Sequence, residues 1–235
     1  MKKTALITLF TTSLVATPLF AADVKLSSSD QKASYALGID LAKNFEKQGL
    51  DLDLDALVLG MKDVMNKQKI RLTEDEMQKA VQEVKQKMIK KQQEARKLQG
   101  EKNAKAGQAF LEKNKTKPGV KVTKSGLQYK VLTEGKGTSP TDEDYITANY
   151  KGTLIDGTVF DSSYKRGTPI EFQLNNVIAG WKEALKMMKP GAKWEIYVPP
   201  SLAYGSKGAG RVIGPNETLI FTIELISASK DKPEH

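Results

Sequence analysis

The sequence predicts an α+β protein, with an all-helical N-terminal part and a C-terminal antiparallel sheet wrapped on one short helix. Two observations predict it. No proline occurs between Pro18 and Pro118, so nothing interrupts a helix in that stretch. After Pro118, short runs of β-branched and aromatic residues alternate with glycine and proline turns, which is typical of antiparallel strands. We place the domains at residues 23–118 and 119–235, after a leading segment over residues 1–22.

The leading segment has the order of a secretory signal peptide. Lys2 and Lys3 precede an uncharged apolar run over residues 5–15, Pro18 breaks the run, and small residues follow. An apolar core of about 11 residues is too short to span roughly 30 Å of hydrocarbon, which argues against a stable membrane anchor. We therefore expect an exported protein from which residues 1–22 are removed.

Two residue types that carry much enzyme chemistry are nearly absent. The chain has no cysteine, and its single histidine is His235. Disulfides and a lipid attached through cysteine are excluded, so packing alone must hold each domain. Histidine acid–base catalysis, a catalytic triad and a histidine metal site are disfavoured as well. We expect neither a metal nor a cofactor.

Two short helices are expected first in the N-terminal part. Ser29 or Asp30 can cap the first, which carries apolar residues at a spacing of four and ends near Gly49. Asp53 can cap the second, whose apolar residues again form one stripe. The two patterns predict amphipathic helices with a thin apolar face each.

A long connecting helix is expected next, from Thr73 to around Lys115. Thr73 and Glu76 have the spacing of a capping box, and at 1.5 Å per residue the helix would be about 60 Å long. Its apolar stripe weakens beyond Leu98, among glycine, asparagine and charged residues. We interpret the part before Leu98 as packed, and the part beyond it as a spacer that bridges the domains through solvent.

Three thin apolar stripes make a poor core for a monomeric domain of fewer than about 100 residues. Pairing with a second copy through residues 23–100 would bury them, so a homodimer is favoured. A small self-contained three-helix domain remains the alternative.

The chain is basic, with a formal net charge of +9. Many lysines lie between Lys79 and Lys117, but acidic residues are interleaved with them. Interleaved charge is typical of a solvated helix face, so we expect no nucleic-acid partner.

The C-terminal part contains five candidate strands and one short helix. The strands are expected over residues 127–132, 145–154, 170–173, 193–198 and 218–226. Asp156-Gly157 between apolar runs predicts a tight hairpin. The helix fits over residues 177–188, with Trp181 on its inner side.

Several motifs follow one another in this part in a fixed order. They are Asn149-Tyr150-Lys151-Gly152, Asp156-Gly157-Thr158-Val159-Phe160-Asp161-Ser162-Ser163, Val177-Ile178-Ala179-Gly180-Trp181, Met188-Lys189-Pro190-Gly191, Val198-Pro199-Pro200, Ala203-Tyr204-Gly205 and Thr218-Leu219-Ile220-Phe221. The ordered set resembles the FKBP-type peptidyl-prolyl isomerases across essentially their whole domain. With the leading segment and the helical part, the chain also resembles the macrophage infectivity potentiator (Mip) proteins of Gram-negative bacteria.

The resemblance implies a proline-binding pocket with Trp181 as its floor. It implies these catalytic residues: Tyr150, Phe160, Asp161, Trp181, Tyr204 and Phe221. It implies these residues for binding substrate or macrolide inhibitors: Arg166, Ile170, Val177, Ile178, Val212 and Ile213. Asp161 as a catalytic group and Asp161 as a plain salt-bridge partner of Arg166 both remain open. Phe172 is left as core or pocket edge.

Two positions depart from the pattern of the family. Ile170 stands where many relatives have an aromatic residue, so one wall should be aliphatic. The loop over residues 205–211 is rich in glycine and has no histidine, so we expect it to be mobile and to contact ligands differently.

Rotation about an X-Pro amide breaks no bond, so such an enzyme needs no nucleophile, metal or cofactor. We therefore expect a peptidyl-prolyl cis-trans isomerase acting on proline-containing polypeptides in the periplasm or on the outer surface of a Gram-negative bacterium. The Mip resemblance adds a V-shaped homodimer, chaperone activity in the dimer cleft and a virulence role. The alternative is a non-enzymatic holdase chaperone or host-surface binding module.

Overall fold

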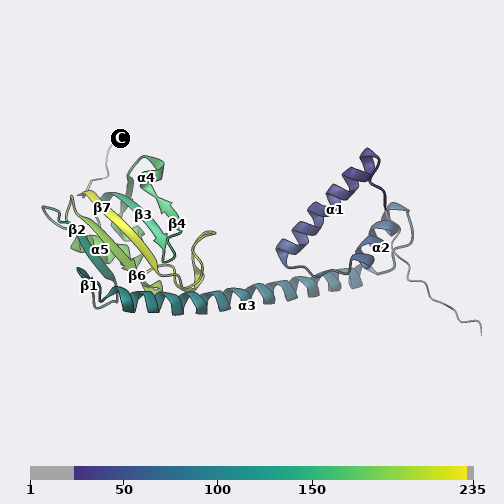
Figure 1. Ribbon diagram of the computed structural model, residues 1–235, viewed down its shortest axis with the longest axis horizontal. Coiled ribbons are helices and arrows are strands. Elements are labelled where there is room, and N and C mark those ends of the chain that lie inside the picture. The colour runs from purple at the N-terminus through teal and green to yellow at the C-terminus, as the bar shows by residue number, and fades with distance from the viewer. Residues whose placement is uncertain (1–23, 232–235) are drawn as a thin grey trace, which may run out of the picture. The chain divides into compact units, whose positions relative to one another are not determined.

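The computed structural model describes residues 24–231, so the predicted signal peptide lies outside the described residues. The chain divides into two compact units, one up to Val84 and one from Lys85 onward, and the long helix α3 belongs partly to each (Figure 1). The domain limits 23–118 and 119–235 stay a prediction. No helix between residues 24 and 231 is long and apolar enough to cross a membrane.

The predicted helices are present in the N-terminal half. They are α1 (Ser29–Gln48), α2 (Leu54–Met65) and α3 (Glu74–Asn114). Ser28 caps α1 by accepting a hydrogen bond from Gln31 N, while the Gln31 side chain reaches back to the cap. The predicted cap, Ser29 or Asp30, is therefore wrong by one or two residues, because only Ser28 stands three residues before a glutamine.

The other two predicted caps are confirmed. The Asp53 carboxylate accepts from Ala56 N at 2.9 Å at the start of α2. At the start of α3, Thr73 N donates to Glu76 Oε2 at 2.8 Å and Glu76 N donates to Thr73 Oγ1 at 3.3 Å. These local bonds fix where each helix begins.

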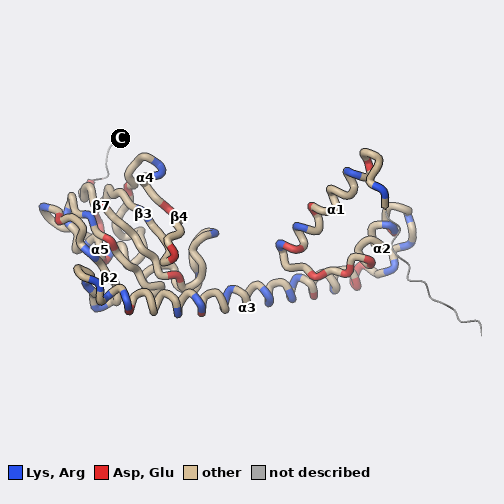
Figure 2. Tube along the Cα trace, in the orientation of Figure 1, with Lys and Arg blue, Asp and Glu red and all other residues tan. Residues whose placement is uncertain are grey.

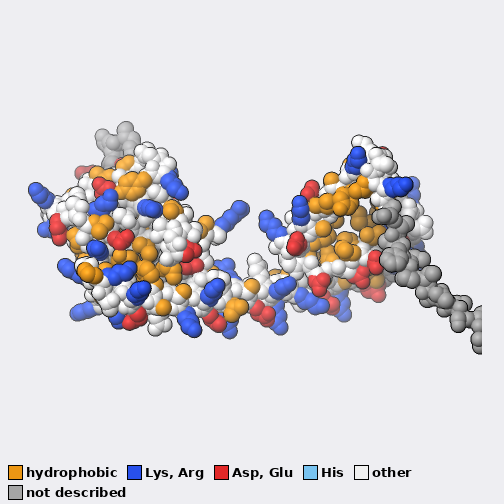
Figure 3. All heavy atoms as spheres, viewed as in Figure 1, with side chains coloured by type: hydrophobic (Ala, Val, Ile, Leu, Met, Phe, Trp, Pro, Cys, Tyr) orange, Lys and Arg blue, Asp and Glu red, His pale blue; other side chains and the backbone are white. Residues whose placement is uncertain are grey.

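The N-terminal unit has no apolar core of its own in the described chain. Between residues 24 and 84 the buried side chain is that of Asp63, which Arg71 contacts at 2.7 Å. Large apolar side chains are instead exposed, for example Leu37 (71%) and Val64 (65%). Figure 3 shows hydrophobic side chains gathered on the surface over α1 and α2.

The C-terminal unit contains a seven-stranded antiparallel sheet. Its strands are β1 (Val120–Val122), β2 (Gln128–Thr133), β3 (Tyr145–Leu154), β4 (Val159–Ser162), β5 (Ile170–Gln173), β6 (Lys193–Val198) and β7 (Leu219–Ser229). Their order is β1-β2-β6-β7-β3-β4, and β5 pairs with β3. The predicted strands are all present, and β1 and β4 are additional. Gly157 adopts a φ of 89° in the predicted turn between β3 and β4.

One face of the sheet is covered by α5 (Ala179–Met187), close to the predicted range 177–188. Alternate residues of β3 and β7 are buried there, as expected for strands with one face on the core. Ile146, Leu185 and Ile223 are fully buried in this layer. The fold class predicted from the sequence is confirmed.

The second half of α3 is packed against the C-terminal unit rather than solvated, so the spacer prediction beyond Leu98 is wrong. Gly100, Asn103, Gly107 and Asn114 are buried on this face of the helix. They are small or polar residues, which is why the contact leaves no apolar stripe in the sequence. Basic and acidic residues alternate along the rest of α3, as predicted (Figure 2).

Candidate active site

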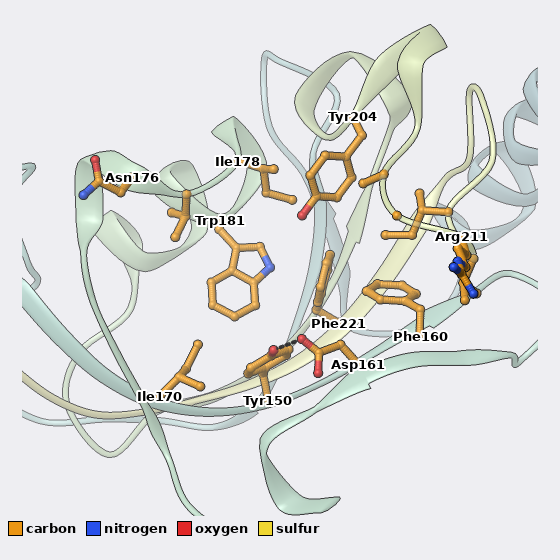
Figure 4. A pocket seen from close by; sticks show the side chains of 15 residues that line it. Tyr150, Phe160, Asp161, Ile170, Asn176, Ile178, Trp181, Tyr204, Arg211 and Phe221 are labelled. Carbon is orange, nitrogen blue, oxygen red and sulfur yellow. Dashed lines mark hydrogen bonds between the residues drawn. The ribbon is translucent and has the colours of Figure 1, made fainter. Parts of the chain in front are cut away.

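A cavity of about 490 Å³ opens in the C-terminal unit between α5, the sheet and the loop that follows Tyr204 (Figure 4). The residues that line it are Tyr150, Phe160, Asp161, Ile170, Asn176, Val177, Ile178, Trp181, Tyr204, Ala209, Gly210, Arg211, Val212, Ile213 and Phe221. Aromatic and aliphatic side chains predominate among them. A cavity of this size and lining fits a small apolar ring.

Aromatic rings set edge to face form the floor and one wall of the cavity. The Trp181 ring, held by α5, is 3% exposed, and the rings of Tyr150 and Phe221 each lie 5.2 Å from it at nearly right angles. Phe160 meets Phe221 in the same way at 5.5 Å. A Cβ on Gly152 would lie 2.5 Å from the Phe160 ring, so glycine in β3 is what lets that ring lie against the sheet. Such aromatic pairs hold one another in fixed orientations.

One carboxylate lies at the cavity wall, and its oxygens are occupied by hydrogen bonds. The Tyr150 hydroxyl and the Arg166 guanidinium both donate to Asp161, and Ser162 N donates to Asp161 Oδ1 at 2.8 Å. Arg166 also donates to the Tyr150 hydroxyl at 3.0 Å and lies over its ring. Figure 4 shows the bond between Tyr150 and Asp161.

These contacts set the protonation states of the group. Partial burial by itself would raise the pKa of Asp161, but the hydrogen bonds from Tyr150 and Arg166 outweigh burial and hold the pKa below its ordinary value. Burial is the main cause that raises the pKa of Tyr150, and its hydrogen bond to Asp161 raises this pKa further. At neutral pH the pair is therefore a carboxylate and a neutral phenol.

The opposite wall is formed by Tyr204 and residues 209–213. In Figure 4 the Tyr204 hydroxyl points into the cavity, above Trp181 and Phe221. Val212 and Ile213 directly follow the glycine-rich loop over residues 205–211, and Ile170 gives the aliphatic wall expected from the sequence. The cavity thus has an aromatic floor, one hydroxyl above it and an irregular loop on one side.

The structure brings the predicted site residues together, with one difference. All of them line the cavity except Arg166, which reaches it through Asp161 and Tyr150. Phe172 does not line it; its ring lies 5.7 Å from that of Trp181, on the core side. The roles assigned to these residues stay predictions.

Sequence reasoning missed some lining residues. They are Asn176, Ala209, Gly210 and Arg211. Asn176 ends the short 3₁₀ helix Leu174–Asn176 and the other three lie in the loop after Tyr204, all outside the ordered motifs. The last three belong to the loop over residues 205–211, which was expected to contact ligands although its lining residues were not named.

Two family models together match almost the whole described chain. Residues 136–226 match the FKBP-type peptidyl-prolyl cis-trans isomerase model, and residues 30–131 match the domain amino terminal to FKBP-type peptidyl-prolyl isomerase. The chain belongs to the FKBP-type peptidyl-prolyl cis-trans isomerase family.

Individual relatives agree over nearly their full lengths. The isomerase is 48% identical to peptidyl-prolyl cis-trans isomerase Mip of Coxiella burnetii, over 94% of this chain and 93% of that one. It is 46% identical to outer membrane protein MIP of Legionella longbeachae, over 92% and 93% of the two chains. The crystal structure of FkpA from Escherichia coli has a TM-score of 0.71 at 39% identity and covers 86% of this chain and 97% of its own. The predicted Mip-like resemblance is confirmed.

Proposed function

We propose that the cavity over Trp181 is where this isomerase holds the prolyl ring while the preceding amide rotates. The observation that carries the proposal is the cavity itself, about 490 Å³ in volume, with an aromatic floor and a single fully hydrogen-bonded carboxylate. Trp181, Phe160 and Phe221 contact the ring in this proposal. Ile170, Val177 and Ile178 complete the apolar wall.

The chemistry needs only this environment. Resonance keeps the X-Pro amide planar and places partial negative charge on its oxygen. At the twisted transition state the resonance is lost and the amide becomes less polar. Water stabilises the polar planar form, so transfer to a dry apolar cavity favours the twisted form by comparison. A 10⁴-fold acceleration corresponds to about 5.5 kcal/mol.

Two donors are placed to orient the rotating chain. The Tyr204 hydroxyl points into the cavity, and Trp181 Nε1 is buried with no acceptor among residues 24–231. Either can donate to a carbonyl of the bound peptide, since an unpaired buried donor gains most from an acceptor. Asp161 acts through Tyr150, whose ring it holds against the floor, and Arg166 fixes both.

Exchange spectroscopy on a short prolyl peptide tests the proposal. The wild-type chain should accelerate cis–trans exchange, and an FKBP-binding macrolide should abolish the acceleration. Trp181→Leu should lower kcat/KM by about 10- to 100-fold, because the floor loses its ring. Leu132→Ala, an exposed site on β2, is the control and should leave kcat/KM unchanged. Unchanged exchange with Trp181→Leu in a folded protein would remove the cavity from the mechanism.

We further propose that the N-terminal unit pairs two copies and that the paired chains bind unfolding polypeptides as a chaperone. The support is the set of exposed apolar side chains on α1, α2 and the first part of α3. These apolar side chains are removed from water only when another surface, here a second copy of the chain, packs against them. A non-enzymatic holdase is the alternative; it predicts refolding assistance that survives Trp181→Leu.

Export to the periplasm or outer surface is also proposed, with the signal pattern of residues 1–22 as its support. One relative carries the name outer membrane protein MIP. Fractionation of a Gram-negative host, together with N-terminal sequencing of the processed chain, tests both export and the cleavage site.

A further inference from the structure

One wall of the cavity is a loop that only a few hydrogen bonds of its own hold in place. Residues 209–213, which line the cavity, form a small hairpin in which Ala209 N donates to Ile213 O at 2.9 Å and Ile213 N donates to Ala209 O at 3.2 Å. The base of the loop is closed where Asn216 N donates to Gly205 O at 2.8 Å. Gly208 and Gly210 both adopt positive φ. Because glycine has wide conformational freedom, the backbone of this segment restrains its own position only weakly.

The second half of α3 fastens the base of this loop. Asn103 Nδ2 donates to Pro215 O at 2.9 Å, and Asn216 Nδ2 donates to Gly100 O at 3.3 Å. The Arg96 guanidinium donates to Lys207 O on the other side of the base. Two of these three bonds end on loop carbonyls, so they constrain where the loop backbone lies.

Spacing and size allow the helix to come this close. Residues 96, 100, 103 and 107 recur at four, three and four, which places them on one face of α3. A Cβ on Gly100 would lie 3.3 Å from Pro215 Cβ, and one on Gly107 would overlap Thr218 Oγ1. Larger residues at these positions would therefore lift the helix away from the loop.

Asn103 is oriented for this contact. Its side chain is buried, at 8% exposure, and Gln99 Nε2 donates to Asn103 Oδ1 at 2.7 Å. With its oxygen occupied by Gln99, the amide presents its NH₂ group to Pro215 O. Loss of this donor would leave a partly buried carbonyl without its partner.

We propose that Asn103 is a positioning residue of the isomerase, which acts from α3 to set how closely the wall of residues 209–213 approaches a bound chain. The inference rests on the proposed use of the cavity over Trp181. The floor is built on α5 and β7 and does not depend on this contact. Asn103 should therefore affect binding of residues that flank proline, while the rotation step on the floor proceeds as before.

The test compares Asn103 with Asn114, a second buried asparagine on α3 whose Nδ2 bonds to Gln128 Oε1 at 3.0 Å, away from the loop. Asn103→Ala should raise KM for a prolyl peptide, and the Kd of a macrolide, by about three- to tenfold, the factor that a neutral hydrogen bond is worth, with kcat within about twofold. Asn103→Asp keeps the shape but turns a carboxylate oxygen instead of a donor toward Pro215 O, and should give at least the same rise. Asn114→Ala should lower stability and leave KM unchanged.

Arg96 supplies a variant that is safe for folding, because its side chain is exposed and it holds the same loop through Lys207 O. Arg96→Ala should raise KM in the same direction, and amide NMR signals of residues 209–213 should shift in both Asn103→Ala and Arg96→Ala. Wild-type KM in these variants, or an equal rise in Asn114→Ala, would overturn the inference. Full activity of Trp181→Leu would instead contradict the proposed site and leave the loop shifts to report on the contact itself.

Discussion

The two units of this chain use their apolar residues in opposite ways. The C-terminal unit buries Leu185 and Ile223 completely between α5 and the sheet, whereas the N-terminal unit leaves Leu37 and Val64 mostly exposed and buries no apolar side chain in its described residues. Burial of apolar surface is the main stabilising term in folding. The C-terminal unit can therefore hold itself together, while the N-terminal unit needs another surface to cover its apolar side chains.

The largest expected effect tests the self-sufficiency of the C-terminal unit. Leu185→Ala should lower the free energy of unfolding by about 2–5 kcal/mol, because it opens a cavity under the sheet. Urea unfolding followed by tryptophan fluorescence measures it, since Trp181 and Trp194 both lie in this unit. The cost should be the same at low and high protein concentration.

Leu132→Ala is the matched control, because this leucine is 47% exposed on β2. Its cost should stay below about 1 kcal/mol. The C-terminal unit would not be self-sufficient if the two substitutions lowered the free energy of unfolding equally. The same would follow if the effect of Leu185→Ala depended on protein concentration.

The second prediction tests whether the N-terminal unit is completed by a second copy. Met61→Glu places a charge on the exposed apolar face of α2, where Met61 is 50% exposed. It should raise the dissociation constant of the proposed dimer by at least about 100-fold, because pairing would bury an unpartnered carboxylate. Sedimentation should show half the wild-type mass, with isomerisation of a short peptide unchanged.

Gln82→Glu adds the same charge at an exposed polar position on α3 and should leave the mass unchanged. A wild-type chain that sediments as a monomer at all concentrations would contradict pairing. The alternative, a self-contained three-helix domain that leaves Leu37 and Val64 exposed to water, would then hold.

The third prediction concerns the carboxylate at the cavity. Asp161→Leu should lower kcat/KM by about tenfold, because the Tyr150 hydroxyl loses its acceptor and the ring is no longer fixed. The matched control is Asp142→Leu, which removes an exposed carboxylate bonded to Lys186 at 2.5 Å and away from the cavity. Full activity of folded Asp161→Leu would reduce Asp161 to a salt-bridge partner of Arg166.

The lowered pKa of Asp161 gives this prediction a pH dependence. A depressed folded-state pKa means that the carboxylate stabilises the site above its unfolded pKa of about 3.9 and loses this effect as pH falls through the folded value. Wild-type kcat/KM should therefore stay flat from about pH 5 to pH 9. A step near neutral pH would point to a titrating group that the site does not contain among its lining residues.

Local signals explain most of what the sequence predicted. The caps at Asp53 and Thr73 depend on residues three positions apart, so the sequence contains the whole interaction. The strand over residues 145–154 was placed to the residue because it is a run rich in β-branched and aromatic residues that ends at the Asp156-Gly157 turn. The cavity was predicted through ordered motifs of the family, which supply long-range information that periodicity does not.

The contact between α3 and the loop after Tyr204 could not be predicted in this way. It is made by Gly100, Asn103 and Gly107, and small or polar residues leave no hydrophobic period for a pattern to detect. The same loop was expected to be mobile from its glycines, yet hydrogen bonds to helix residues 112 and 116 positions earlier hold its base. Contacts between residues so far apart in the sequence form only in the folded chain, so no local pattern predicts them.

The smallest expected effect concerns a hydrogen bond on the surface of the C-terminal unit. The Tyr164 hydroxyl donates to Glu224 Oε2 at 2.9 Å, and partial burial together with this bond raises the pKa of Tyr164 to about 12. A raised folded-state pKa gives stability that is present below the unfolded value of about 10 and is lost as pH rises from there through 12. Tyr164→Phe should therefore cost on the order of half a kcal/mol at pH 8, where the side chain is 46% exposed and solvent weakens the bond. The free energies of unfolding of the two proteins, measured in urea, should converge as pH rises from about 10 to 12, because the wild-type phenol loses its proton and the donor with it. A difference that stays constant over that range would show that the hydrogen bond to Glu224 is not its cause.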